Sequence, residues 1–290
     1  GCAINNNDKI QFGGSIGIPI LNYKSNVTFK ESDTSNDAGN NFSSFAYTDN
    51  MRTSGVGANL KMGLIYRPKQ YIRLGVALHS PTYMFSMTDK RSTTLTANTE
   101  DYNHTAFTTS ETFLNGVPNN NNYTMLTPWK FNVSRSYVFR EIENVRKQRA
   151  FITADIEYLR HRASSFYSAS EVPDPAEKNY YKSLNKVIKS EYKSNFNFRV
   201  GGEVKFNVIM ARLGFAYYSN PYKDKALKAN KMLLSGGIGY RNKGFFIDLT
   251  YVHAFNKDVN FPYRLADKAN TFATEKNQRG NIVASVGFKF

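Results

Sequence analysis

The chain ends with the stretch Asn281-Ile-Val-Ala-Ser-Val-Gly-Phe-Lys-Phe290, and this stretch decides the fold class. Its residues alternate with a period of two, as in a β-strand, where successive side chains point to opposite faces. The apolar face carries Ile282, Ala284, Val286, Phe288 and Phe290. The other face, small or polar, carries Val283, Ser285, Gly287 and Lys289. The sequence therefore predicts a strand with one apolar face that ends on an aromatic residue.

Two kinds of structure use such a strand. An edge strand of a soluble β-sandwich gains little from a terminal aromatic residue, because chain ends fray. A bacterial outer-membrane β-barrel closes its last strand against its first, and Phe290 would then be held. The terminal aromatic pattern also resembles the signal read by the barrel-insertion machinery, which makes that machinery an expected partner. We therefore favour the barrel over the sandwich.

Length and composition agree with one barrel domain over residues 1–290. No run approaches the ~18 apolar residues of a membrane helix. A mean hydropathy of -0.50 does not argue against a barrel, because the alternating strands of a barrel give a weak hydropathy signal. The 22 Phe and 19 Tyr residues would supply the aromatic girdles of such a barrel.

The formal net charge is +15 at pH 7. The basic residues are spread along the chain and form no arginine-rich run, so nucleic acid is not an expected partner. Lipopolysaccharide phosphates, or a lumen that attracts anions, account for the excess equally well. The single cysteine, Cys2, excludes an internal disulfide and a cysteine-based metal site. Because the chain starts Gly1-Cys2-Ala3, with neither Met nor a signal segment, we expect a longer precursor.

About ten alternating strands follow one another, and the links between them fall into two length classes. The short links are Arg67–Gln70, Arg140–Gln148, the turn near Asn207 and Arg241–Lys243. The long, polar links are Ser32–Asn50, Pro81–Met125, Ala163–Ser190, Ser219–Lys231 and Asn256–Arg279. Short periplasmic turns and long outer loops are typical of transmembrane barrels. The prediction is an antiparallel transmembrane β-barrel with its C-terminus at the periplasmic rim, and with a bulge or kink at Pro19.

An ordered set of motifs carries a family resemblance. The motifs are Gly55–Pro68, Ile72–Thr82, Thr127–Lys130, Asp155–Tyr158, Phe198–Glu203 and Arg212–Tyr222. In this order and spacing the chain resembles the FadL family of outer-membrane channels for long-chain fatty acids and other hydrophobic compounds. The resemblance implies a fourteen-stranded barrel with an N-terminal plug inside it. About ten strands and no plug are found here, so we expect an N-terminal truncation, and no plug residues are carried over.

Charged side chains fall on the non-lipid face of the predicted strands. They are Lys61, Arg73, Asp155, Glu157, Arg199, Glu203, Lys205, Arg212, Asp248 and Lys289. Two interpretations fit them: a structural lattice of ion pairs that lines the lumen, or a conduit suited to amphipathic anions. Arg135 is an exception, because its position predicts the lipid face.

The apolar segment Pro81–Met87 lies where a strand enters the longest predicted loop. Tyr83, Phe85 and Met87 are spaced two apart, so in an extended segment they share one face. We expect them to capture a hydrophobic ligand, helped by Phe107 and Phe113 from the same loop. The alternative is that the run belongs to the outer aromatic girdle.

No catalytic or cofactor pattern accompanies these features. His79, His104, His161 and His253 lack metal-ligand spacing, although capture of haem or metal by loop histidines stays open. Asp248 and His253 lie on opposite faces of one strand and cannot pair. Gly236-Gly-Ile-Gly239 opens no helical pattern, so it is a poor dinucleotide fingerprint.

We therefore predict neither an enzyme nor a cofactor. The predicted function is uptake of hydrophobic small molecules, such as long-chain fatty acids, across the bacterial outer membrane. The alternative is an envelope scaffold or secretion-linked anchor with no transport role.

Overall fold

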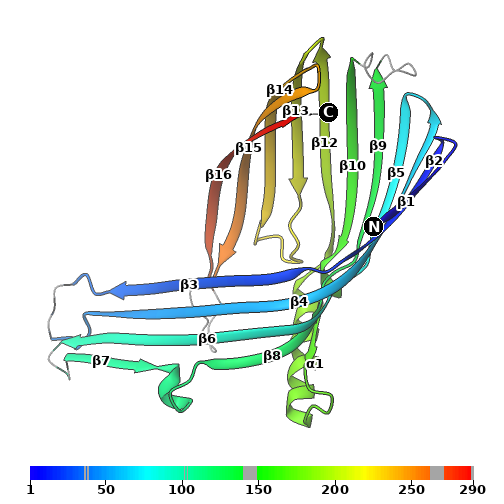
Figure 1. Cartoon of the computed structure of the whole chain (residues 1–290). Coiled ribbons are helices and arrows are strands. Elements are labelled where there is room, and N and C mark those ends of the chain that lie inside the picture. The colour runs from blue at the N-terminus through cyan, green and yellow to red at the C-terminus, as the bar shows by residue number, and fades with distance from the viewer. Residues whose placement is uncertain are drawn as a thin grey trace.

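The computed structural model describes residues 1–35, 37, 39–100, 102, 104–139, 149–261 and 271–288. In this part of the chain, sixteen antiparallel strands form one continuous sheet. The sheet has two wings that run nearly at right angles to each other (Figure 1). The prediction of an all-β antiparallel structure is confirmed, with more strands than the ten expected.

The upright wing, called here the main wing, contains the motifs that alternate most regularly. Its strands are β1 (Cys2–Asn6), β2 (Ile10–Gly17), the C-terminal half of β4 (Ser44–Lys69), β5 (Ile72–His79), β9 (Lys130–Phe139), β10 (Ala150–Arg160), β12 (Ser194–Phe206), β13 (Ile209–Tyr218), β14 (Asn230–Asn242), β15 (Phe245–Asn260) and β16 (Ala273–Phe288). Among the described residues β1 pairs only with β2 and β16 only with β15, so these two strands are the edges of the main wing.

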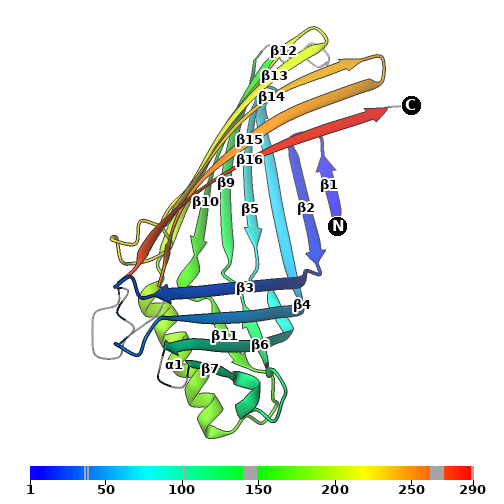
Figure 2. The ribbon, with the colours of Figure 1, turned by 90° about the vertical axis from the view of Figure 1, so that its left-hand side faces the viewer.

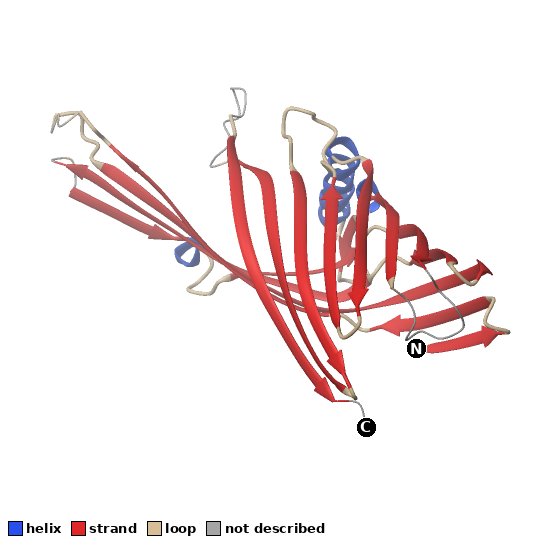
Figure 3. Ribbon diagram, turned by 90° about the horizontal axis from the view of Figure 1, so that it is seen from above, coloured by secondary structure: helices blue, strands red, loops and turns tan. Residues whose placement is uncertain are grey.

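The second wing, called here the side wing, projects from the foot of the main wing (Figure 2). Its strands are β3 (Ile20–Ser32), the N-terminal half of β4, β6 (Tyr83–Glu100), β7 (His104–Thr109), β8 (Asn119–Leu126) and β11 (Ser165–Ser168). The helix α1 (Pro175–Glu191) and the short 3-10 helix η1 (Ser110–Phe113) accompany it, and η3 (His161–Ala163) precedes β11 (Figure 3). No helix within the described ranges is long and apolar enough to cross a membrane.

Strand β4 joins the wings because its two halves have different neighbours. Its first half pairs with β3 and β6, and its second half pairs with β2 and β5. The predicted kink at Pro19 lies at this junction, between β2 and β3, and is confirmed. Proline has no N–H to donate to a ladder, and the Pro19 carbonyl instead accepts a 3.0 Å bond from Gly57 N.

Several predicted loops are wrong. Pro81–Met125 is largely strand, because β6, β7 and β8 find partners in the side wing. Ala163–Ser190 contains β11 and α1, whose start at Asp174-Pro175 follows the usual N-cap pattern. Asn256–Arg279 contributes strand residues at both ends, and its centre, residues 262–270, lies outside the described residues. The short link 140–148 also lies outside them.

The sorting of links by length is confirmed where the structure describes it. The turns near Asn207 and at Lys243-Gly244 close one end of the main wing. The segments between β10 and β12 and between β13 and β14 lie at the other end. Strand β16 ends at Phe288, opposite Phe245, and so finishes at the short-turn end as expected.

The antiparallel register gives the main wing two distinct faces. Ile152, Gly202, Leu213, Gly236 and Tyr251 form one cross-strand row on the apolar face. On the polar face, Asp155 stands opposite Arg199, and Glu203 opposite Arg212. From β5 to β16 the pairings keep their register, and the β4–β5 pairing shifts only near its turn, between Tyr66 and Lys69, so these faces continue across the wing.

The side wing holds the main buried cluster of the described residues, under α1. Met84, Met87, Tyr123 and Tyr181 form it, with Met125, Phe166 and Leu184 packed around them. Asn185 ties α1 to β11, because its amide both accepts from Phe166 N and donates to Phe166 O at 2.8 Å. This paired contact occupies the backbone groups of an edge strand.

Met87 and Phe85 should differ sharply in their effect on the side wing. Met87 is 2% exposed and Phe85 49%. Met87→Ala should destabilise the wing by about 2–5 kcal/mol, through lost contacts and a cavity. Phe85→Ala should have a much smaller effect, because its ring is half exposed. Hydrogen exchange of the β6 and β8 amides measures both, and equal acceleration by the two substitutions would contradict the packing described.

Candidate functional site

The predicted capture row does not exist as one face. A bulge between Met84 and Met87 shifts the register of β6 against both β4 and β8. The extra residue reverses the alternation beyond it, so Met87 joins the buried cluster under α1. Tyr83 and Phe85 stay exposed, with their rings 6.2 Å apart. The prediction that Met87 shares their face is therefore wrong.

The bulge is stabilised by two glycines that periodicity alone did not explain. A Cβ on Gly55 would collide with Met87 Sδ, and one on Gly57 would lie 2.5 Å from Met84 Sδ. The two methionines therefore pack directly against the backbone of β4.

Phe107 and Phe113 also lie apart from Tyr83 and Phe85. Phe107 is on β7, opposite Thr96, which is eleven residues beyond Phe85 on β6. At about 3.3 Å per strand residue this is roughly 36 Å along the strand. Phe113 is in η1, and both rings are exposed. Of the five predicted ligand-binding residues, the structure brings together only Tyr83 and Phe85.

The polar face of the main wing carries two clusters of ion pairs. Arg199 Nε bonds Asp155 Oδ1 at 2.6 Å, and Arg199 Nη2 lies 3.8 Å from Glu157 Oε2. Arg212 Nε bonds Glu203 Oε2 at 2.6 Å, and its Nη1 bonds Asp248 Oδ1 at 2.6 Å. Each guanidinium joins two carboxylates that lie on the same face, so two positive charges meet four negative charges in these clusters.

The Arg212 contact with Asp248 spans β14, and glycine makes room for it. Arg212 is on β13 and Asp248 on β15, with Gly237 and Gly239 between them. A Cβ on Gly239 would meet Asp248 Oδ1 and lie 3.5 Å from Arg212 Nη2. Gly239 therefore leaves the space on the polar face through which the Arg212 guanidinium reaches Asp248.

The other charged residues that the sequence assigned to this face also alternate onto it. Lys61 is opposite His79, Arg73 is opposite Ser136, and Lys205 is opposite Met210. Lys289 lies outside the described residues. Arg135 points to the apolar face, between Leu74 and Ala154, and nothing in the structure explains it.

Gly239→Val should separate Arg212 from Asp248. The loss of a charge-assisted hydrogen bond should destabilise the protein by about 1.5–3 kcal/mol. Gly236→Val, three positions away in β14 and therefore on the opposite face, is the matched control, because a Cβ there would meet only Leu213 Cδ2 at 3.7 Å. The unfolding midpoint in urea, followed by gel mobility without heating, compares them. The account fails if both variants unfold at the same urea concentration.

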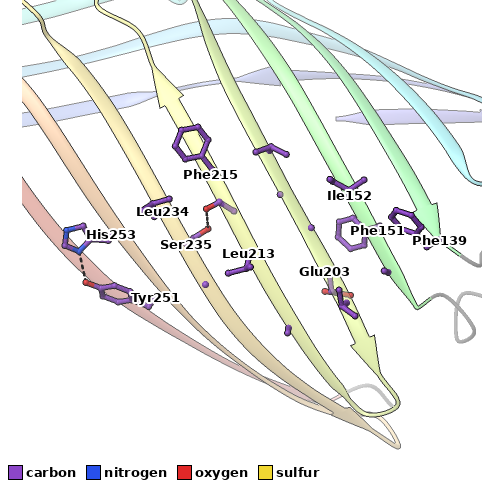
Figure 4. Close-up of a pocket in the computed structure, with 18 of the residues that line it drawn as sticks. Phe139, Phe151, Ile152, Glu203, Leu213, Phe215, Leu234, Ser235, Tyr251 and His253 are labelled. Atoms are coloured by element: carbon purple, nitrogen blue, oxygen red, sulfur yellow. Dashed lines mark hydrogen bonds between the residues drawn. The ribbon is translucent and has the colours of Figure 1, made fainter.

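The apolar face carries a groove of about 1010 Å³ across β10, β12, β13, β14 and β15 (Figure 4). Its walls are almost entirely aliphatic or aromatic, and they include Ile152, Val200, Leu213, Phe215 and Leu234. Tyr251 OH and His253 Nδ1, 2.8 Å apart, form the polar pair at one side. A groove of this size holds small organic ligands.

Glycines shape this groove. Gly202 and Gly236 flank Leu213 in one cross-strand row, which leaves Leu213 77% exposed between two hollows. Sequence reasoning missed the groove. The signal in the sequence was Gly202 and Gly236, two glycines at positions of the apolar face. Alternation alone does not show which glycines of these strands lie on the apolar face and which on the polar face.

The sequence raised two further candidates: metal capture by histidines, and a pairing of Asp248 with His253. No group of three or more His, Cys, Asp or Glu within the described residues could hold a metal ion. Asp248 and His253 lie on opposite faces, as the spacing predicted.

Comparisons with known proteins were informative about the fold. No family model matches the chain, and no curated protein matches it. Among solved structures, it is similar to the CymD monoaromatic hydrocarbon channel at 12% identity, with a TM-score of 0.57. It is also similar to the P. putida toluene transporter TodX and the Ralstonia pickettii toluene transporter TbuX, each at 16% identity, with TM-scores of 0.57 and 0.52.

These alignments include nearly the whole chain. Each covers 99% of it, and 71%, 67% and 66% of the three solved chains respectively. At such identities the likeness shows the fold alone. The chain therefore has the antiparallel sheet of a transmembrane β-barrel, as the sequence predicted.

Proposed function

We propose that the protein takes up hydrophobic small molecules across the bacterial outer membrane, as a channel. The observation that carries the proposal is the apolar groove over β10 to β15, on a sheet shared with hydrocarbon and toluene transporters. In this proposal the apolar face contacts lipid, and the polar face with its ion pairs lines the lumen.

The groove suits a hydrocarbon for a physical reason. Each CH₂ that moves from water into the groove contributes about 0.8 kcal/mol, so a short alkyl chain or an aromatic ring that arrives from water binds without any hydrogen bond. On the lipid-facing side, a molecule leaving the groove enters the bilayer rather than water. The groove would then be a site where cargo exchanges with the membrane.

The cargo in this proposal includes long-chain fatty acids as well as hydrocarbons. Tyr83 and Phe85 lie at the start of β6, near the junction of the wings. They offer an exposed apolar surface for first capture, with Phe107 and Phe113 as separate apolar patches on the side wing. Met87 is left out because it is buried.

Lipopolysaccharide is the proposed partner of α1. Lys178, Lys182, Lys186 and Lys189 are spaced four, four and three residues apart, so they share one face of the helix. Such a row would face the sugar phosphates at the outer surface. The barrel-insertion machinery, through β16, is proposed as the second partner.

Filling the groove tests the proposed function. Gly236→Phe places a ring in the hollow beside Leu213, with no backbone atom in the way. Gly14→Phe is the control, because Gly14 is also on the apolar face and a Cβ there meets only Lys61 O at 3.7 Å. Uptake of labelled toluene and of labelled oleate by cells that express each variant is measured.

The proposal expects a drop of at least about tenfold for Gly236→Phe and near wild-type uptake for Gly14→Phe. A scaffold or anchor without transport predicts the same uptake in both variants and in cells that lack the protein. That outcome would reject the channel.

A further inference from the structure

The side wing has one face that α1 does not cover, called here the open face. α1 packs on the other face, where Tyr181 joins the buried methionine cluster. Strands β3, β4, β6 and β8 lie side by side (Figure 1), and on the open face they form three neighbouring cross-strand rows. The rows are Asn22-Ser54-Thr88-Asn122, Lys24-Arg52-Lys90-Asn120 and Asn26-Asn50-Ser92. All of these side chains are polar, and none is a carboxylate.

The middle row, called here the basic row, places three basic residues directly opposite one another. Arg52 on β4 lies between Lys24 on β3 and Lys90 on β6, and all three are exposed. Neighbouring strands are about 4.8 Å apart, so the three side chains start within about 10 Å across the sheet. Like charges directly opposite each other destabilise a sheet. The basic row therefore weakens the side wing unless an anion neutralises it.

The carboxylates nearest to the basic row do not neutralise it. Along β4 and β6 these are Asp49 and Asp89, which alternate onto the face toward α1. Asp49 there pairs with Arg91 at 2.6 Å, and Asp89 accepts a bond from Thr53 Oγ1 at 2.7 Å. Within the described residues, no ion pair includes a residue of the basic row. The three positive charges are therefore available to an external anion.

Protection of a sheet edge does not explain the basic row. Lysines on an exposed edge strand prevent it from pairing with another chain. That reason applies to Lys24, because β3 pairs only with β4 among the described residues. Arg52 and Lys90 lie on β4 and β6, which have a neighbour on both sides at these positions. Their charges need another reason, and binding of a ligand supplies one.

The side chains around the basic row indicate the chemistry of this ligand. Phosphate is the matching anion, because Arg and Lys bind its oxygens through charge-assisted hydrogen bonds. The flanking rows supply amides and hydroxyls, which both donate and accept as sugar hydroxyls require. Asn26 Nδ2 donates to Asn50 Oδ1 at 2.6 Å, and Thr88 Oγ1 donates to Asn122 Oδ1 at 2.9 Å. These two bonds hold the exposed amides of Asn50 and Asn122 in place beside the basic row.

Other large anionic partners lack the contacts that they need on this face. Single-stranded nucleic acid stacks its bases on aromatic side chains. A protein partner is held by apolar and aromatic anchors that become buried. The three rows contain no aromatic and no aliphatic side chain. The open face therefore fits a phosphorylated saccharide best.

The position of the side wing indicates where this saccharide comes from. The wing leaves the main wing at the end opposite the turns near Asn207 and at Lys243-Gly244 (Figure 2). Short turns of a transmembrane barrel are periplasmic, so the side wing lies on the outer side of the membrane. The phosphorylated saccharide of that surface is the sugar region of lipopolysaccharide.

We infer that the open face binds the phosphorylated sugars of lipopolysaccharide, with the basic row on the phosphates and the flanking amides on the sugar hydroxyls. The inference goes beyond transport, and it rests on the proposed function only for the place of the side wing outside the bilayer. It also assigns a surface distinct from the lysine row of α1. Because α1 packs on the opposite face of the wing, the two surfaces can be tested apart.

The test uses the saccharide without its lipid. Fully deacylated lipopolysaccharide keeps its phosphates but lacks the acyl chains that would bind the apolar face. A second sample has its phosphates removed with hydrofluoric acid, and a single-stranded oligonucleotide with the same number of phosphates is the third probe. Purified protein in non-ionic detergent micelles at pH 7.5 is titrated with each by calorimetry. The phosphorylated saccharide should bind at least about tenfold more tightly than either other probe, and less tightly at high salt. Equal binding of all three probes would overturn the inference.

Two variants with the same change of charge assign binding to the basic row. The row variant carries Lys24→Gln, Arg52→Gln and Lys90→Gln. The control variant carries Lys9→Gln, Lys69→Gln and Lys243→Gln, at exposed positions in or beside the short turns. Each Lys or Arg near an anionic membrane surface contributes about fivefold in affinity. The row variant should therefore lose on the order of a hundredfold, and the control variant should bind like wild type. Equal affinities in the two variants would contradict the inference.

A third variant separates the open face from α1. It carries Lys178→Gln, Lys182→Gln and Lys186→Gln, on the helix. Binding at the basic row should survive these substitutions, with the same preference for the phosphorylated saccharide. Complete loss of binding in this variant would place the site on α1 and reject the open face.

Hydrogen exchange shows that the row variant is folded and tests the cause of its effect. Without saccharide, the β3 and β4 amides of the row variant should exchange more slowly than in wild type, because the repulsion is removed. Faster exchange would mean that the basic row supports the wing itself, and the inference would fail. Saccharide binding is measured without transport, and uptake in Gly236→Phe without saccharide. Failure of either proposal therefore leaves the other standing.

Discussion

The hydrogen-bonded register of the main wing is the constraint on which the rest of the structure depends. A slip of one residue in any strand would turn its apolar side chains to the polar face. Because the register is kept from β10 to β16, Arg212 can reach Glu203 on one neighbour and Asp248 two strands away. The same register places Gly202 and Gly236 on either side of Leu213. One alignment therefore produces both the ion pairs and the groove.

Glycine has three separate uses in this register. Gly55 and Gly57 admit methionine side chains, Gly237 and Gly239 admit a guanidinium, and Gly202 and Gly236 leave hollows for a ligand. Each use depends on which face the missing side chain would have occupied. Together they connect the packing of the side wing, the charges of the polar face and the apolar groove to one kind of residue.

Sequence reasoning predicts the features that depend on local alternation of residues. It does not predict the features that depend on pairing with strands distant in the sequence. The faces of β12 and β13, the short turn at Lys243-Gly244 and the break at Pro19 all follow from neighbouring residues. The segment from Pro81 to Met125 contains too many Thr and Asn residues to predict strands, yet it is ordered by pairing with β4. The reversal at Met87 needs the bulge, which depends on glycines some thirty residues away.

The central claim is that the apolar face of the main wing meets lipid and the polar face meets water. Spin labels attached to Ile247→Cys, Asp248→Cys, Leu249→Cys and Thr250→Cys, each combined with Cys2→Ser, test it along β15 in lipid vesicles. Relaxation by oxygen, which concentrates in lipid, should be strongest at positions 247 and 249. Relaxation by a water-soluble nickel chelate should be strongest at positions 248 and 250. The opposite phase, or no alternation along these four positions, would contradict the account.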